Sequence, residues 1–154
     1  MIFRTPTQKS DLKGSFYRAD RPFFASGACH ILTQAFLEFV ENGDWKASLI
    51  APHPGFRGLH VFAHNHRYAF DYHGFTRVDR FHDHYAKKMK RFFPGWSGDI
   101  VEINVSTTSE EFCHAYNLRM PGNFFKDPGP RAKAFVRRFT APDSMNTAQE
   151  HDLL

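Results

Sequence analysis

The chain has 154 residues, of which 42% are apolar and 23% charged, and its formal net charge is +4 at pH 7. This composition excludes an intrinsically disordered protein, and the length suits one domain with a substantial core. No apolar run approaches the roughly 20 residues of a membrane helix, and the first residues lack the apolar stretch of a secretory signal, so we expect a cytoplasmic protein with no membrane partner.

The first half of the chain predicts one helix followed by three strands. Residues 1–20 are polar and irregular, and we expect an extended arm lying on the domain. From about residue 26 to residue 43, apolar residues recur every three or four positions, which is typical of a helix with one buried face; Ser26 suits its N-cap. Apolar runs bounded by polar or Pro/Gly-rich turns then predict strands at 45–50, 58–63 and 67–72.

The second half predicts a further strand among helices. The expected elements are a charged helix at 79–92, a strand with one buried face at 100–105, a short helix capped by Thr108 or Ser109, and a basic helix at 128–139. This order indicates an α+β domain with a mostly antiparallel sheet. We expect residues 1–140 to form that single domain and residues 141–154 to form a flexible tail.

Cys29 is the better candidate for a reactive thiol. Two cysteines are too few for a disulfide framework or a cysteine-based zinc site, so both are expected to be free thiols in a reducing cytosol. Cys29 falls in the first turn of the predicted helix, where unpaired backbone N–H groups and the helix dipole lower the pKa of a thiol. Its position alone fits a small buried core residue equally well.

The predicted hairpin places a histidine beside an aspartate. With Asn65-His66 as the turn, His60 lies directly opposite Asp71, and side chains opposed in this way share a face with Cβ atoms about 4.5–5.5 Å apart. A carboxylate at that distance can hold one nitrogen of an imidazole while the other nitrogen faces a thiol. A slip of one residue would separate the two side chains. The sequence therefore predicts a catalytic site of Cys29, His60 and Asp71, with no cofactor.

These residues carry a resemblance to a known superfamily. The segments Ser26-Gly27-Ala28-Cys29-His30, His60-Val61-Phe62 and Phe70-Asp71-Tyr72-His73-Gly74, within about a third of the chain, resemble the papain-like fold in its broad sense. That superfamily includes NlpC-type cell-wall peptidases and transglutaminase-like proteins.

The resemblance implies a fold and a role for each residue. Its fold is an N-terminal helix that carries the cysteine and packs on a small, mostly antiparallel sheet. Cys29 would attack an acyl or amide carbonyl, His60 would accept and return the proton, and Asp71 would orient His60. Gln34 follows the cysteine, whereas the glutamine of papain-type enzymes precedes it. The backbone N–H of Cys29 is therefore the expected oxyanion donor.

His30 and Cys113 are interpreted as structural. His30 adjoins Cys29, but successive helix residues point about 100° apart, so we interpret His30 as a helix-face histidine with a local hydrogen bond. Cys113 lies beside Phe112, which favours packing.

The ten histidines also raise the possibility of a metal site. His64 and His66 flank a predicted turn, however, and His82 and His84 fall in a predicted helix, where paired ligands are expected four residues apart. We therefore expect no metal ion.

Two functions remain open at this point. One is a cysteine-dependent hydrolase or acyltransferase whose partner is a peptide, amide or acyl substrate. The other is a non-catalytic binding module whose basic helices contact an acidic partner or nucleic acid. Since a charge of +4 more often serves solubility, we do not expect nucleic-acid binding. Rapid alkylation of Cys29 compared with Cys113 would favour the enzyme.

Overall fold

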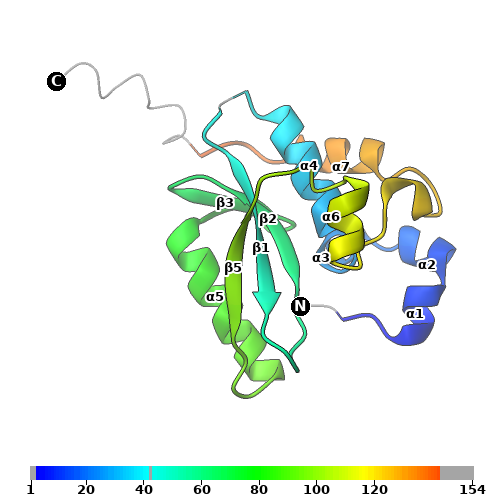
Figure 1. Cartoon of the computed structure of the whole chain (residues 1–154). Helices are drawn as coiled ribbons and strands as arrows, with labels where there is room; N and C mark the ends of the chain where they lie inside the picture. Colours follow the sequence, from blue (N-terminus) through cyan, green and yellow to red (C-terminus); the bar gives the residue numbers. More distant parts are fainter. Residues whose placement is uncertain (1–2, 42, 143–154) are drawn as a thin grey trace.

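The computed structural model describes residues 3–41 and 43–142, and its centre is a five-stranded sheet. Every neighbouring pair of strands is antiparallel, in the order β4-β3-β2-β1-β5 (Figure 1). The strands are β1 (Lys46–Pro52), β2 (His60–His64), β3 (Tyr68–Asp71), β4 (Gly74–Arg77) and β5 (Gly98–Ile103). The α+β class and the antiparallel sheet are thereby confirmed.

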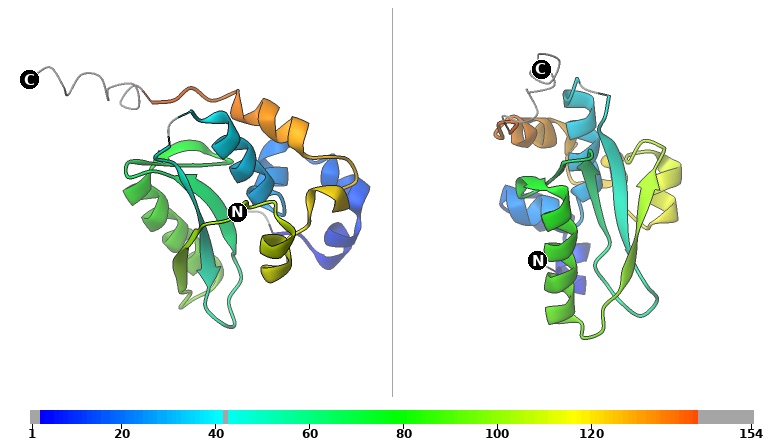
Figure 2. Two further views of the ribbon diagram at one scale, coloured as in Figure 1. Left: turned by 45° about the horizontal axis from the view of Figure 1, so that its top comes forward. Right: turned by 90° about the vertical axis from the view of Figure 1, so that its left-hand side faces the viewer.

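Helices cover both faces of this sheet (Figure 2). The long helix α5 (Val78–Phe92) lies on one face, where its apolar residues pack on Ile50, Phe62 and Ala69. On the opposite face lie α3 (Asp20–Ala25), α4 (Cys29–Phe39), α6 (Glu110–Ala115) and α7 (Gly129–Val136). Within the described residues, every helix is too short or too polar to cross a membrane.

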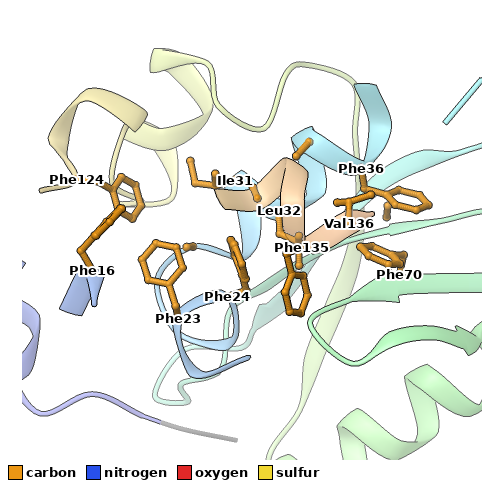
Figure 3. Close-up of a cluster of buried hydrophobic side chains, with 14 of the residues drawn as sticks. Phe16, Phe23, Phe24, Ile31, Leu32, Phe36, Phe70, Phe124, Phe135 and Val136 are labelled. Atoms are coloured by element: carbon orange, nitrogen blue, oxygen red, sulfur yellow. The ribbon is translucent and has the colours of Figure 1, made fainter. Parts of the chain in front are cut away.

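A phenylalanine-rich core fixes α4 on the sheet (Figure 3). The ring of Phe36 on α4 stacks on Phe70 of β3, with ring centroids 4.2 Å apart and planes 12° apart. Phe24 and Phe135 extend the same core toward α3 and α7. Burial of each such ring contributes about 1.5–3 kcal/mol to folding. The core therefore holds the start of α4 at a fixed place beside β2.

The expected extended arm at residues 1–20 is wrong. Two short helices, α1 (Pro6–Ser10) and α2 (Leu12–Phe16), occupy half of it. Thr5 and Gln8 form a capping box at α1, and the Asp11 side chain accepts a hydrogen bond from the backbone N–H of Gly14 at α2. Helices of five residues are too short to produce a repeating apolar stripe, so periodicity did not reveal them.

The predicted bounds of the cysteine helix are also wrong. Ser26 is the C-cap of α3, and α4 begins at Cys29, after Ala28, and ends at Phe39. Gly27 has a φ of 107°, a backbone conformation that favours glycine, and this residue turns the chain between the two helices. The break brings Cys29 to the first position of its helix.

The other elements largely match the prediction. Helix α5 and the Ser109 cap of α6 are confirmed, whereas β4 was not predicted. The expected buried face of β5 is wrong, because Ile100 and Val101 are 49% and 39% exposed on this edge strand. Residues 143–154, most of the predicted tail, lie outside the described residues.

Candidate active site

The side chains of His60 and Asp71 lie next to each other in the interior of the protein. The Nε2 of His60 is 3.0 Å from Oδ2 of Asp71, and the two residues are only 3% and 4% exposed. Asp71 also accepts hydrogen bonds from the backbone N–H of His73 (2.9 Å) and from its Nδ1 (3.2 Å). Burial raises the pKa of the Asp71 carboxyl, but the bonds from His60 and His73 outweigh it, so this pKa lies well below its usual value.

The predicted register of the hairpin that carries this pair is wrong by two residues. His64 pairs with Ala69 rather than with Arg67. The Oδ1 of Asn65 accepts hydrogen bonds from the backbone N–H groups of Arg67 (2.8 Å) and Tyr68 (2.7 Å), so the turn is centred on His66-Arg67. A shift of two residues preserves which face each side chain occupies. His60 and Asp71 are therefore diagonal neighbours, which their side chains bridge.

Cys29 reaches this pair from the first turn of α4. Its Sγ accepts a hydrogen bond of 3.5 Å from the backbone N–H of Val61, the residue that follows His60 on β2. Burial raises the pKa of the Cys29 thiol, but hydrogen bonds and charge interactions with His30 and His60 lower it to about 5. Cys29 therefore lies beside the part of β2 that carries His60.

The charge state of this group follows from the pKa values. Burial lowers the pKa of His60, but hydrogen bonds with Asp71 and Cys29 raise it to about 9. The lowered pKa of Cys29 and the raised pKa of His60 both favour a thiolate beside a protonated imidazole. Because Nε2 of His60 faces Asp71, Nδ1 is the nitrogen left for the sulfur.

Aromatic rings enclose His60 on the side of α5. The ring of Tyr85 stacks on the imidazole, with centroids 5.6 Å apart and planes 5° apart, and Tyr72 meets it edge-on at 5.9 Å. The hydroxyl of Tyr85 donates a hydrogen bond to the carbonyl of Gly58. These contacts fix the plane of the imidazole and limit the access of water to it.

One cavity opens onto the sulfur and the imidazole. Its volume is about 230 Å³, and Cys29, His60, Tyr72 and Tyr85 are among the residues that line it. A cavity of this size admits the end of a small molecule or one side chain of a peptide. The pair of Cys29 and His60 is therefore reachable despite its low exposure.

The interpretation of His30 as a helix-face histidine with a local hydrogen bond is wrong. His30 is fully buried, and its Nε2 donates a hydrogen bond of 2.7 Å to the carbonyl of Arg119, which is distant in sequence. Its Nδ1 is buried without an aligned partner among the described residues, yet the ring interacts with the sulfurs of Cys29 and Cys113. These interactions outweigh burial and raise the pKa of His30 to about 9.

The remaining residues singled out in the sequence lie outside the site. Gln34 accepts a hydrogen bond of 3.1 Å from the backbone N–H of Thr107, and Cys113 is fully buried. His64 contacts Ser48. No group of three or more residues among His, Cys, Asp and Glu within the described part of the chain has the geometry of a metal site.

Sequence reasoning missed several residues around the site. Tyr72, Tyr85 and Arg4 line its cavity but come from three separate regions of the chain. The only local signal was the place of Tyr72 next to Asp71. Comparisons of the chain with models of protein families, with curated proteins and with solved structures find no match. The geometry of the site therefore carries the functional argument by itself.

Proposed function

We propose that the protein is a cysteine-dependent hydrolase or acyltransferase that acts on an amide, peptide or related acyl bond. The observation that carries this proposal is that Cys29 lines the same cavity as His60, whose imidazole is held at 3.0 Å by the buried carboxylate of Asp71. A buried thiolate paired with an oriented imidazole is the arrangement that nucleophilic acyl transfer needs. A purely structural cysteine has no need of it.

The chemistry would proceed in two steps. The Cys29 thiolate attacks the carbonyl carbon of the substrate, and the developing oxyanion accepts a hydrogen bond from the backbone N–H of Cys29, which has no partner within the helix at the first position of α4. His60 donates its proton to the leaving group as the carbon–nitrogen or carbon–oxygen bond breaks, which leaves a thioester on Cys29. Water, or another nucleophile that accepts the acyl group, then attacks the thioester and gives its proton to His60. The thioester bond breaks and the Cys29 thiolate is released.

We further propose that this arrangement is a variant of the papain-like fold. The order of the elements supports it: a helix with cysteine at its first position precedes antiparallel strands that carry the histidine and the acidic residue. We propose a cytoplasmic location as well, because the mechanism requires a reduced thiol and both cysteines are free.

Selective alkylation tests the proposal before any substrate is known. At pH 7 and equal iodoacetamide concentration, we expect Cys29 to be modified at least roughly tenfold faster than Cys113, because Cys29 has a lowered pKa and lines a cavity, whereas Cys113 is fully buried. Peptide mass spectrometry over time measures both rates in the same sample. Slow and equal labelling of both cysteines would overturn the enzyme proposal and favour the non-catalytic binding module.

Turnover provides the second test. In a screen of amide, thioester and peptide substrates, any activity that belongs to this site must disappear in Cys29→Ala. A Cys113→Ala variant is the matched control, since Cys113 is fully buried and outside the cavity. Activity retained by Cys29→Ala would remove Cys29 as the nucleophile.

A further inference from the structure

The cavity beside Cys29 is lined by positive charge. Arg4, Lys9 and Arg57 all line it, and none of the described lining residues is an aspartate or a glutamate. None of these three side chains forms an ion pair with a described carboxylate. Positive charges without counter-ions around a cavity favour an anionic ligand.

Arg4 lies against the turn that precedes the cysteine helix. Its guanidinium lies against Gly27: a Cβ added to that glycine would be 2.5 Å from Nη2 and 2.8 Å from Cζ of Arg4. Only glycine at this position leaves room for the guanidinium two residues before the nucleophile. The arginine also interacts electrostatically with the Cys29 thiolate.

The guanidinium of Arg4 has no hydrogen-bond or ion-pair partner among the described residues. Its Nε is buried and has no hydrogen-bond partner among the described residues. Burial, followed by the charges of Arg119 and Arg18, lowers the pKa of Arg4. A half-buried arginine crowded by two further arginines is an unfavourable arrangement unless an anion joins it. The single charge of the thiolate leaves most of this excess uncompensated.

We propose that the acyl substrate of this site carries a carboxylate close to its reacting carbonyl, and that Arg4 binds this carboxylate, with Lys9 and Arg57 at the mouth of the cavity. The guanidinium has a planar set of donors that fits a carboxylate, and Arg4 is one of the residues that line the cavity. The inference rests on the proposed function, since it concerns the substrate of the same thiol.

Two alkylating reagents that react with a thiolate at the same type of carbon but differ in charge test the inference. In both iodoacetate and iodoacetamide the thiolate displaces iodide and a sulfur–carbon bond forms, but only iodoacetate carries a carboxylate. We expect Cys29 to react faster with iodoacetate than with iodoacetamide, whereas free N-acetylcysteine, whose thiolate repels the anion, shows the opposite order. In Arg4→Gln we expect the ratio of the two rates to fall about tenfold.

The ratio separates substrate binding from thiolate stabilisation. If Arg4 served only to stabilise the thiolate, Arg4→Gln would slow both reagents equally and the ratio would stay constant, which would overturn the inference. Arg67→Gln is the matched control, because Arg67 is exposed on the turn between β2 and β3, away from the cavity. Arg57→Gln provides a second variant, with a smaller fall in the ratio, should Arg4→Gln fail to fold.

The outcomes distinguish this inference from the proposed function. Fast reaction with iodoacetamide but a ratio no higher than that of N-acetylcysteine would overturn the carboxylate site and leave the nucleophile intact. Slow reaction of Cys29 with iodoacetamide would overturn the proposed function itself. A high ratio that declines in 0.5 M salt and in Arg4→Gln, but not in Arg67→Gln, would support both.

Discussion

Strand β2 carries two histidines whose pKa values are shifted in opposite directions. His60 and His64 lie four residues apart, so their side chains occupy the same face of the sheet, the face that α5 covers. Each Nε2 contacts one oxygen: that of His60 meets Asp71 at 3.0 Å, and that of His64 meets the hydroxyl of Ser48 at 2.6 Å. The pKa of His60 is nevertheless raised, and that of His64 is lowered.

The difference arises from the charge of the partners. Burial lowers the pKa of both imidazoles. For His60, a carboxylate and a thiolate outweigh burial. For His64, a backbone hydrogen bond at Asn65 and the charge of Glu102 raise the pKa, but burial and the charges of His82 and Lys46 outweigh them. The raised pKa of His60 thus depends on acidic groups that approach it from other elements.

Replacement of Asp71 or Ser48, the residues whose oxygens contact these two histidines, is expected to give the largest difference in stability. Asp71→Ala removes a buried charge that holds His60 and His73, and we expect the free energy of unfolding to fall by about 3 kcal/mol. Ser48→Ala leaves only a neutral imidazole without its partner, and we expect a loss of about 1 kcal/mol. Urea denaturation at pH 7 measures both. Equal losses would show that the charge of Asp71 adds nothing to the fold.

The sequence was enough to predict that His60 and Asp71 lie on the same face of the hairpin, but not which residues pair across its two strands. His60 and Asp71 share a face in both the predicted and the observed register, because the two differ by an even number of residues. The exact turn depends on Asn65, whose side chain bonds to two backbone N–H groups in place of a symmetric loop. The spacing of apolar residues does not indicate which polar residue of a turn forms such hydrogen bonds, so the exact turn could not be predicted.

The rest of the site depends on contacts between distant segments. Cys29 could be found because the amphipathic pattern of α4 places it near a helix start. Tyr85 and Arg4 could not, since the first reaches His60 through the packing of α5 and the second reaches Gly27 through the path of the N-terminal segment. His30 shows the same limit, because its partner Arg119 is 89 residues away.

Titration of the two histidines is expected to show shifts in opposite directions. His60 should titrate near pH 9, above its ordinary value of 6.5, and His64 should titrate below 6.5. NMR measurement of the imidazole Cε1–H resonances from pH 5 to pH 10 follows both, with assignments from His60→Gln and His64→Gln. A midpoint for His60 at or below 6.5 would contradict the ion pair with Cys29 and Asp71.

The same shifts determine how each histidine contributes to stability. The pKa of His60 is higher in the folded chain, so its contribution is fully present below pH 6.5 and is lost as the pH rises through 9. The pKa of His64 is lower in the folded chain, so its contribution is present above pH 6.5 and is lost as the pH falls below that value. Substituting His60 should therefore flatten the basic side of the stability profile, and substituting His64 the acidic side.

Replacement of each histidine by alanine is expected to separate their effects on the thiol. In His60→Ala the pKa of Cys29 rises, and we expect alkylation by iodoacetamide at pH 7 to slow about tenfold, since the loss of thiolate is partly offset by greater nucleophilicity. His64→Ala should leave the rate unchanged. A pH profile of the rate identifies the cause, because only a change in thiolate pKa moves its midpoint. If the midpoint stayed near 5 in His60→Ala, His30 would be the partner that sets the charge of Cys29.

The smallest expected effect concerns the tyrosine that covers His60 but does not reach His64. Tyr85→Phe removes the hydrogen bond to the carbonyl of Gly58 and keeps the ring that stacks on the imidazole. We expect a loss of about 1 kcal/mol in the free energy of unfolding and a change of no more than about twofold in the alkylation rate of Cys29. Tyr85→Leu, which removes the ring as well, should slow alkylation further, because the plane of His60 is then less restricted. If Tyr85→Phe slowed alkylation as much as Tyr85→Leu, the hydroxyl would be the feature that orients the imidazole. The stacked ring would then contribute packing alone. The difference between His60 and His64 would depend on the polar contact of Tyr85 with Gly58 as well as on the acidic partners of His60.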